Sequence, residues 1–195
     1  MIAIIDYKAG NIASVKNALE RLGQTCVITS KSEEILSADG VIFPGQGRAG
    51  AAMLELRKTG IDKIVPQITK PFLGICLGMQ LLGGTSEEDE TKCLEIFQGV
   101  CRRFPPTLKT PHLGWNKVEL TQKSPLTANV QDGSYFYFVH SYYVDGPELQ
   151  IMGKTSYGFD FASIMQKDNF FAVQFHPEKS GEQGLRLLNN FCELC

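Results

Sequence analysis

The chain has 195 residues, which is enough for one domain with a substantial hydrophobic core. Its formal net charge is −2 and it has no basic cluster, so we expect no nucleic-acid partner. We also expect no membrane partner, because no apolar run is long enough to span a bilayer and the N-terminus reads as a first strand rather than a signal peptide.

Six cysteines are spread along the chain in a pattern unlike the disulfide framework of a small secreted protein. We therefore predict a reducing, cytoplasmic compartment. Cys192 and Cys195 have the CxxC spacing, but no second such pair completes a zinc site. We interpret them as ordinary thiols on the last helix, and we expect neither a metal nor a cofactor.

The first half of the chain alternates short apolar strands with helices. The predicted strands cover residues 2–6, 25–29, 40–43 and 71–75, and the predicted helices cover 12–22, 32–36, 51–58 and 61–68. A turn at 7–11 joins the first strand to the first helix, with Asn11 as the helix N-cap. This alternation predicts an α/β fold with a parallel sheet covered by helices on both faces.

The second half is rich in short β segments separated by turns. The predicted segments cover residues 93–104, 115–120, 134–139, 151–156, 161–166 and 170–175, and an amphipathic helix over 184–195 closes the chain. No linker, repeat or low-complexity tract separates the halves. We therefore predict one domain over residues 1–195, with a mainly parallel central sheet, helices on both faces and an added antiparallel β portion.

Gly74-Ile75-Cys76-Leu77-Gly78 joins a strand to a helix with the spacing of a nucleophile elbow. Strand and helix crowd each other at such a turn, which explains the glycines on both sides of Cys76. Cys76 would stand at the tip of the turn and at a helix N-terminus, where the dipole favours a thiolate. The Leu77 N–H would face an oxyanion. These residues alone leave a structural and a catalytic cysteine equally open.

The loop over residues 44–50 directly follows the third predicted strand. Ligands bind beyond the C-terminal ends of parallel strands, so this loop shares a sheet edge with Cys76. Its glycines allow backbone N–H groups to turn toward a substrate, and the alternative is a tight turn before the next helix. The acidic run at 87–90 is either a solvated loop or the source of one carboxylate for a substrate ammonium group.

His176 differs from the other two histidines by its surroundings, Val173-Gln174-Phe175-His176-Pro177-Glu178. It ends an apolar strand, which places it near the elbow if that strand is parallel. Pro177 favours extended backbone, in which His176 and Glu178 face the same way. Glu178 would orient one imidazole nitrogen while the other faces Cys76. Nucleophile, base and orienter follow the logic of a catalytic triad.

These motifs together resemble a known family. With Gly74-Ile-Cys-Leu-Gly-Met-Gln80 and His176-Pro-Glu178, the chain is similar to the class I (triad) glutamine amidotransferases. Three blocks are similar to the glutaminase subunits of imidazole glycerol phosphate synthases: residues 111–116 (PHLGWN), 135–142 (YFYFVHSY) and 173–180 (VQFHPEKS). The resemblance runs nearly end to end.

The resemblance implies chemical roles for the matching residues. Cys76 would attack the side-chain amide carbon of glutamine, His176 would activate the thiol and protonate the leaving ammonia, and Glu178 would orient the imidazolium. A γ-glutamyl thioester would form, and water would release glutamate. The oxyanion would be held by backbone N–H groups of Leu77 and of the loop with Gly45, Gln46 and Gly47.

The resemblance also implies how glutamine is held. Gln80 and Glu88 match positions that bind the amino-acid end of glutamine, and the backbone at Ser141 and Tyr142 matches a further contact. The chain departs from the family at Gln46, where a small apolar residue is usual, and at Glu95, where glycine is frequent. The first departure bears on how the oxyanion loop is held.

The family's ammonia passes to a partner. The resemblance implies a heterodimer with a separate (βα)₈-barrel cyclase, which uses ammonia to make imidazole glycerol phosphate in histidine biosynthesis. Asn11, Trp115, Tyr137 and Lys179 match positions that face this partner. From the sequence alone they read as a helix cap, an aromatic core residue, a strand residue and a solvated lysine.

Three alternatives remain open at this stage. The same chemistry could feed ammonia to a synthase that acts on a bacterial surface sugar. The triad would also fit an isolated cysteine hydrolase of peptides or esters, although that gives the blocks at Trp115 and His140 no purpose. The non-catalytic alternative is a flavodoxin-like binding or scaffold protein.

Overall fold

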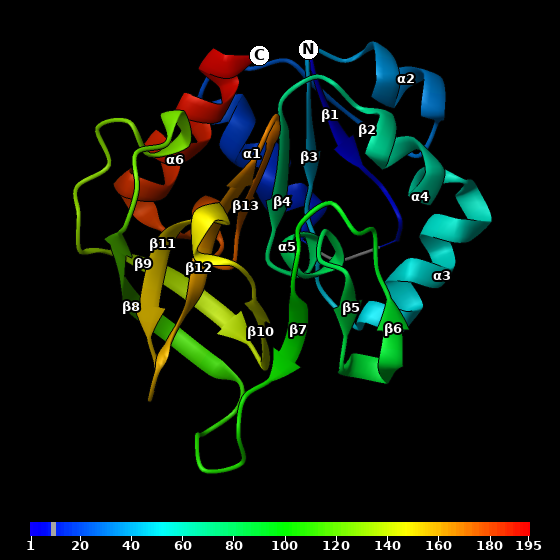
Figure 1. Cartoon of the computed structure of the whole chain (residues 1–195). Coiled ribbons are helices and arrows are strands. Elements are labelled where there is room, and N and C mark those ends of the chain that lie inside the picture. Colours follow the sequence, from blue (N-terminus) through cyan, green and yellow to red (C-terminus); the bar gives the residue numbers. More distant parts are fainter. Residues whose placement is uncertain (9–10) are drawn as a thin grey trace.

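The computed structural model describes residues 1–8 and 11–195, so part of the turn predicted at 7–11 lies outside the described residues. The parallel core contains β2 (Cys26–Thr29), β1 (Ile2–Ile5), β3 (Gly40–Phe43), β4 (Phe72–Ile75) and β13 (Phe170–Val173), in that spatial order. Each neighbouring pair among these strands is parallel (Figure 1). The parallel sheet predicted from the alternating elements is confirmed.

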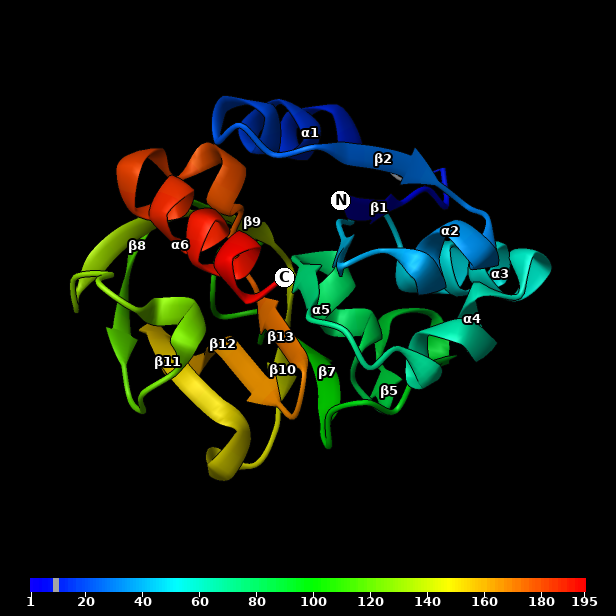
Figure 2. The same ribbon diagram turned by 90° about the horizontal axis from the view of Figure 1, so that it is seen from above.

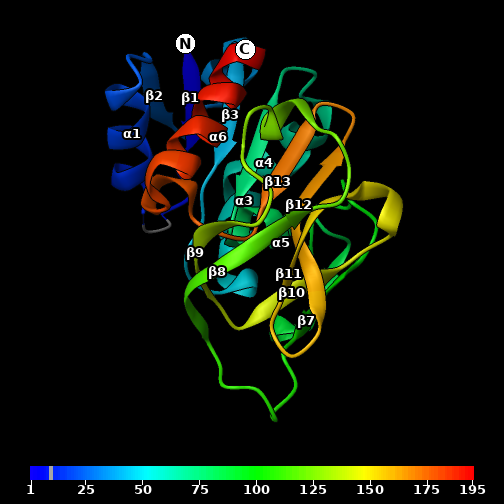
Figure 3. The same ribbon diagram turned by 90° about the vertical axis from the view of Figure 1, so that its left-hand side faces the viewer.

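The antiparallel portion continues from β13. The sheet extends through β12 (Asp160–Lys167), β10 (Tyr142–Asp145), β7 (Val100–Arg103) and the short β5 (Thr85–Ser86) and β6 (Thr91–Lys92). A branch runs from β12 through β11 (Ile151–Ser156) to β8 (His112–Leu120) and β9 (Ser134–His140). This portion lies away from the two chain termini (Figures 1 and 3). The predicted fold class, parallel core plus antiparallel portion, is confirmed.

Helices cover both faces of the parallel core (Figure 2). On one face lie α1 (Ile12–Arg21) and α6 (Gly181–Leu194), and on the other lie α2 (Ser32–Ser37), α3 (Ala49–Thr59), α4 (Ile61–Ile64) and α5 (Leu77–Leu81). Alternating side chains of β1 serve both layers: Ile2 and Ile4 belong to the core under α1 and α6, whereas Ala3 and Ile5 belong to the other core. Burial on both faces explains the continuous apolar runs of these strands.

Several predicted boundaries are wrong for local reasons. The helix predicted over 61–68 is a single α turn, Ile61–Ile64, followed by the 3₁₀ turn Val65–Gln67, because Pro66 removes a backbone donor. The segment predicted as a strand over 93–104 is a strand only at Val100–Arg103. None of the helices in the described part of the chain has the length and hydropathy that crossing a bilayer requires.

Candidate active site

Cys76 occupies a strained turn between β4 and α5. Its backbone angles, φ 54° and ψ −108°, lie in a region that non-glycine residues rarely adopt. The Cys76 N–H donates to the carbonyl oxygen of Val173 at 2.8 Å, which ties the turn to the neighbouring strand β13. Leu77 is the first residue of α5, so its N–H has no acceptor within the helix.

Both flanking glycines are required by close approach of the backbone. A Cβ on Gly74 would lie 2.7 Å from a Leu82 methyl carbon, and one on Gly78 would lie 2.0 Å from the Phe43 carbonyl oxygen. Any side chain at residue 78 would therefore displace β3 or α5. The crowding expected of an elbow is present at both positions.

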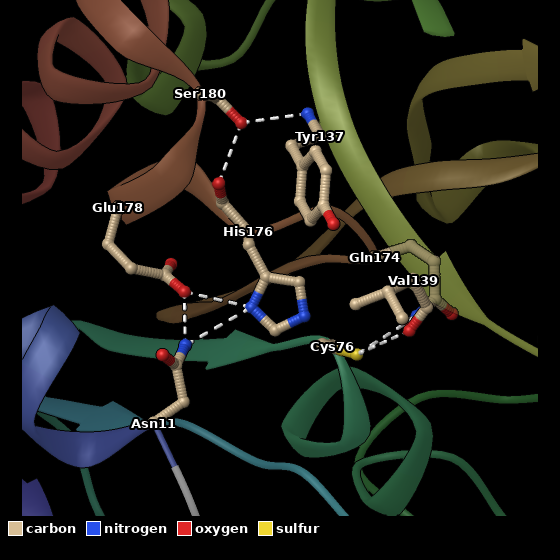
Figure 4. A network of polar contacts seen from close by, with 8 residues as sticks. All are labelled: Asn11, Cys76, Tyr137, Val139, Gln174, His176, Glu178 and Ser180. Carbon is tan, nitrogen blue, oxygen red and sulfur yellow. Dashed lines mark hydrogen bonds and ion pairs between the residues drawn. The ribbon is translucent and has the colours of Figure 1, made fainter. Parts of the chain in front are cut away.

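The register of β13 against β4 brings His176 to the elbow. Val173 lies opposite Ile75 in this parallel pair, so the chain segments that leave the two strands run side by side. His176 is fully buried, and its Nδ1 lies 2.8 Å from Oε1 of Glu178. Nε2 of the same ring points toward Cys76 and has no hydrogen-bond partner among the described residues (Figure 4).

The extended backbone predicted from His176 to Glu178 is wrong in part. His176 itself is extended, but Pro177–Lys179 forms a 3₁₀ turn and does not continue the strand. Ser180 stabilises this turn, because its hydroxyl donates to the His176 carbonyl at 2.6 Å and accepts the Tyr137 N–H at 3.0 Å. No local pattern in the sequence indicated this anchor.

The electrostatics of the pair favour a charged imidazole. Burial lowers the pKa of His176, but the Cys76 sulfur and the Glu178 carboxylate raise it, and together they prevail, so the pKa lies at about 10. The structure thus holds a proton on this ring well above the pH at which a free histidine loses it.

Asn11 does not cap α1 as predicted. It precedes the helix in the left-handed conformation, and its side chain makes no capping hydrogen bond there. Its amide nitrogen instead donates to Oε1 of Glu178 and lies 3.3 Å from Nδ1 of His176 (Figure 4). Asn11 therefore orients the carboxylate, a role that the sequence did not reveal.

Two polar groups approach the sulfur of Cys76. Nε2 of Gln174 lies 3.7 Å from Sγ, and the Val139 carbonyl oxygen lies 3.9 Å from it. Gln174 is completely buried, and its Oε1 accepts a hydrogen bond from Gln80 Nε2 at 3.1 Å. Gln174 had no predicted role, although a polar residue inside the apolar run 173–175 was a usable signal.

A cavity of about 400 Å³ opens beside Cys76. Its walls include the predicted oxyanion residues Leu77, Gln46 and Gly47. They also include the predicted substrate residues Gln80, Glu88, Ser141 and Tyr142. Gly45 lies behind this wall, where a Cβ would meet the Tyr7 hydroxyl at 2.4 Å and Leu77 at 2.7 Å. The structure thus brings the loop, the elbow and the substrate residues around one space.

Glu88 is held at the rim of this cavity. Its Oε2 accepts the N–H of Ala49, the first residue of α3, at 2.7 Å. Gln80 is buried, and its amide nitrogen donates to the Tyr142 carbonyl oxygen at 3.0 Å.

In the described part of the chain, no group of three or more His, Cys, Asp and Glu side chains is arranged to hold a metal ion.

Three of the four residues predicted to face a partner form one surface cluster. Trp115 is 55% exposed, its ring packs edge-on against Tyr137 at 6.1 Å, and Lys179 Nζ lies 5.9 Å from the Tyr137 ring centre. Asn11, by contrast, turns inward to Glu178. Trp115 is therefore a surface residue and not the core residue that the sequence alone indicated.

The chain is similar to known proteins over its whole length. A family model described as glutamine amidotransferase class-I matches residues 3–195. The imidazole glycerol phosphate synthase subunit HisH of Methanocaldococcus jannaschii is 50% identical, with 100% of both chains covered. Its counterpart in Maridesulfovibrio salexigens is 47% identical over 100% of this chain and 97% of that protein.

Solved structures are similar in fold. A structure described as a glutamine amidotransferase has a TM-score of 0.78 at 18% identity and covers 100% of this chain and 98% of its own. A structure of PurLQS from Thermotoga maritima has a TM-score of 0.76 at 16% identity, covering 98% of this chain and 97% of its own. At these identities the match concerns the fold alone.

Proposed function

The chain belongs to the class I glutamine amidotransferases, and we propose that the site around Cys76 carries out the glutaminase reaction of this family. The chain is a glutaminase subunit of imidazole glycerol phosphate synthase and works in histidine biosynthesis. Residues 1–195 act as one glutaminase domain, since the described strands join in one continuous network of pairings.

Cys76 is the nucleophile in this proposal. Its sulfur attacks the side-chain amide carbon of glutamine, and the carbonyl π electrons move to oxygen. His176 then gives the proton held at Nε2 to the departing nitrogen, which leaves as ammonia. The raised pKa of His176 supports this step, because the ring is protonated before attack. Water next adds to the thioester, His176 takes the proton that water loses, and collapse releases glutamate and Cys76.

The oxyanion lies between α5 and the loop in this proposal. The free N–H of Leu77 is one donor, and the peptide N–H groups of the loop over Gly45, Gln46 and Gly47 supply the other. Gly47 has φ 113°, a conformation that only glycine adopts readily, so this loop is built around an unusual backbone path. Loss of one such donor typically reduces the rate by about 10²–10³.

Glutamine is held at its amino-acid end. Glu88 keeps one oxygen on the Ala49 N–H, which leaves the other for the substrate ammonium group. Gln80, Ser141 and Tyr142 also line the cavity. A volume of about 400 Å³ accommodates an amino acid of this size.

A (βα)₈-barrel cyclase subunit is the proposed partner, and it receives the ammonia. Trp115, Tyr137 and Lys179 form the contact surface. This surface adjoins the site directly, since the His176 N–H donates to the Tyr137 carbonyl oxygen at 2.9 Å.

All six cysteines are unpaired, which supports a reducing cytoplasmic compartment.

The observation that carries the proposal is the buried His176–Glu178 pair beside Cys76, whose side of the elbow lines the cavity. The test is glutamate release from glutamine by the purified chain, alone and with a barrel cyclase plus its nucleotide ligand. Strong stimulation by the cyclase is expected. Equal activity with and without the cyclase would contradict the proposed partner, and no glutamate under either condition would contradict the glutaminase assignment.

A further inference from the structure

Two buried histidines outside the triad form a pair, and one of them, His140, lines the glutamine cavity. His112 and His140 face each other across the β8–β9 pair and are 4% and 5% exposed. His112 Nδ1 lies 2.9 Å from His140 Nε2, and His140 Nδ1 lies 2.8 Å from the Tyr142 carbonyl oxygen. The triad chemistry uses neither ring.

The hydrogen bonds fix where each proton lies. A carbonyl oxygen only accepts, so His140 carries its proton on Nδ1 and donates to Tyr142. Nε2 of a neutral His140 is then bare and accepts from Nδ1 of His112. Nε2 of His112 is bare in turn, and it lies 3.2 Å from the side-chain nitrogen of Asn116.

The Asn116 end of this series of hydrogen bonds is held independently by backbone groups. The Asn116 amide nitrogen also donates to the Ser156 carbonyl at 3.0 Å, while its oxygen accepts the Lys117 N–H at 2.8 Å. The orientation of the amide is therefore set by backbone groups, and it presents a donor to His112. The bonds from Asn116 to Tyr142 all run in one direction, which requires both rings to be neutral.

Burial keeps both rings neutral. It lowers the pKa of His112 to about 4 and that of His140 to about 3, even though the hydrogen bond from His140 to Tyr142 acts in the opposite direction. Aromatic rings surround the pair: the centre of the Phe161 ring lies 5.2 Å from that of His140 and 5.9 Å from that of His112.

The series of hydrogen bonds ends at Tyr142, which lines the cavity. The Tyr142 carbonyl oxygen accepts from His140 and also from Gln80, and His140, Ser141, Tyr142 and Gln80 all line the cavity that contains Cys76. Ser141 falls between β9 and β10, where its carbonyl oxygen accepts the Phe104 N–H at 3.1 Å. That bond leaves the Tyr142 carbonyl to be held by the side chains of His140 and Gln80. The His140 side chain bridges this gap from one strand to the next.

We propose that His140, locked in its Nδ1–H tautomer by His112, is a positioning residue for glutamine that sets the backbone path at Ser141 and Tyr142. The inference rests on the proposed function, since it assigns this wall to glutamine binding. His140 itself does not take part in proton transfer.

The kinetic test uses the chain in complex with its cyclase. His140→Phe keeps a ring but removes both nitrogens, so the KM for glutamine should rise roughly five- to tenfold, the usual effect of one lost hydrogen bond, with kcat within about twofold. His140→Asn places an amide donor near the position of Nδ1, so its KM should return most of the way to the wild-type value. Phe161→Leu is the matched control, since it disturbs packing on both rings without touching the hydrogen bonds, and its KM should stay within about twofold.

The structural test needs no activity. Because the sequence contains only three histidines, a ¹⁵N–¹H long-range spectrum of the labelled full chain resolves each ring. His112 and His140 should both show the neutral Nδ1–H tautomer, and His112→Phe should change the His140 signals. An Nε2–H tautomer or a charged ring at neutral pH would overturn the arrangement. An unchanged KM in an active His140→Phe enzyme would overturn the positioning role alone, whereas a wild-type complex without glutaminase activity would overturn the proposed function.

Discussion

His176 and Glu178 form a buried pair, with Nδ1 2.8 Å from Oε1, at a 3₁₀ turn that begins immediately after the histidine. The same oxygen of Glu178 accepts the Asn11 amide. The carboxylate is thus held from two elements, the 3₁₀ turn of Pro177–Lys179 and the start of α1. Its orientation does not depend on a partner subunit.

Asn11→Ala should therefore lower glutaminase activity in the isolated chain as well as in the complex. The loss should be about tenfold in kcat, because one charge-assisted hydrogen bond to the orienting carboxylate is removed. Trp115→Ala is the matched comparison, since it should lower only the stimulation by the cyclase. Steady-state glutamate release with and without the cyclase checks both, and an Asn11→Ala effect confined to the complex would assign Asn11 to the interface instead.

Cys76→Ser should abolish glutamine-dependent synthesis by the complex, with a loss of at least about 10³-fold in kcat. Synthesis from added ammonium should stay within about twofold of wild type, because the barrel receives ammonia from solution. Cys195→Ser, at the exposed C-terminus, is the control for loss of a thiol. Simultaneous loss of the ammonium-dependent reaction would argue against the role assigned to Cys76.

The raised pKa of His176 predicts how stability depends on pH. The folded protein binds the proton up to about pH 10, whereas the unfolded chain releases it near 6.5, so protonation stabilises the fold. This contribution is complete below pH 6.5 and disappears as the pH rises through 10. The difference in unfolding free energy between wild type and His176→Gln should therefore shrink across this range in urea titrations. A difference that grows with pH would contradict the predicted direction.

Gly78→Ala should disrupt the elbow, because its Cβ would lie 2.0 Å from the Phe43 carbonyl oxygen. We expect a loss of about 1–3 kcal/mol in unfolding free energy together with a large loss of kcat. Gly83→Ala, whose Cβ would lie 3.2 Å from the Gln80 carbonyl oxygen and 3.8 Å from that of Gly99, serves as the control and should lose much less. Denaturant melts of both variants make the comparison, and equal losses would rule out the contact with β3 as the cause.

Tyr7→Phe should leave stability unchanged or increase it by up to about 1 kcal/mol. The Tyr7 hydroxyl is buried and has no hydrogen-bond partner among the described residues, and burial raises its pKa strongly. Its removal relieves an unsatisfied polar group while the ring keeps its contact with Phe43. Thermal unfolding of the two proteins is sufficient, and a loss beyond 1 kcal/mol would show that the hydroxyl is satisfied in solution.

The sequence predicted the parts of the fold in which periodicity dominates. The apolar runs of β1, β3 and β4, the spacing of Val15 and Leu19 on α1, and the glycines at 74 and 78 each follow from local rules. Family resemblance then supplied most of the residues that line the cavity, but not Pro111, Val139 and His140. These two sources covered the elbow, the loop and the substrate wall.

The remaining features depend on tertiary contacts that no local pattern reveals. Asn11 is a favourable N-cap residue by type, but the carboxylate of Glu178, distant in sequence, competes successfully for its amide. β10 was not predicted, because Tyr142–Asp145 is held by pairing with β7 and β12 rather than by an alternating pattern. The buried pair His112 and His140 likewise depends on the register of β8 against β9.

The adjacency of β4 and β13 has a consequence during synthesis of the protein. The thiol at residue 76 leaves the ribosome 100 residues before the imidazole at residue 176. A nascent chain that ends within β12 carries the elbow but neither His176 nor Glu178. If these residues act as proposed, we expect ammonia release to begin only after β13 has paired with β4, so that truncated translation products hydrolyse no glutamine.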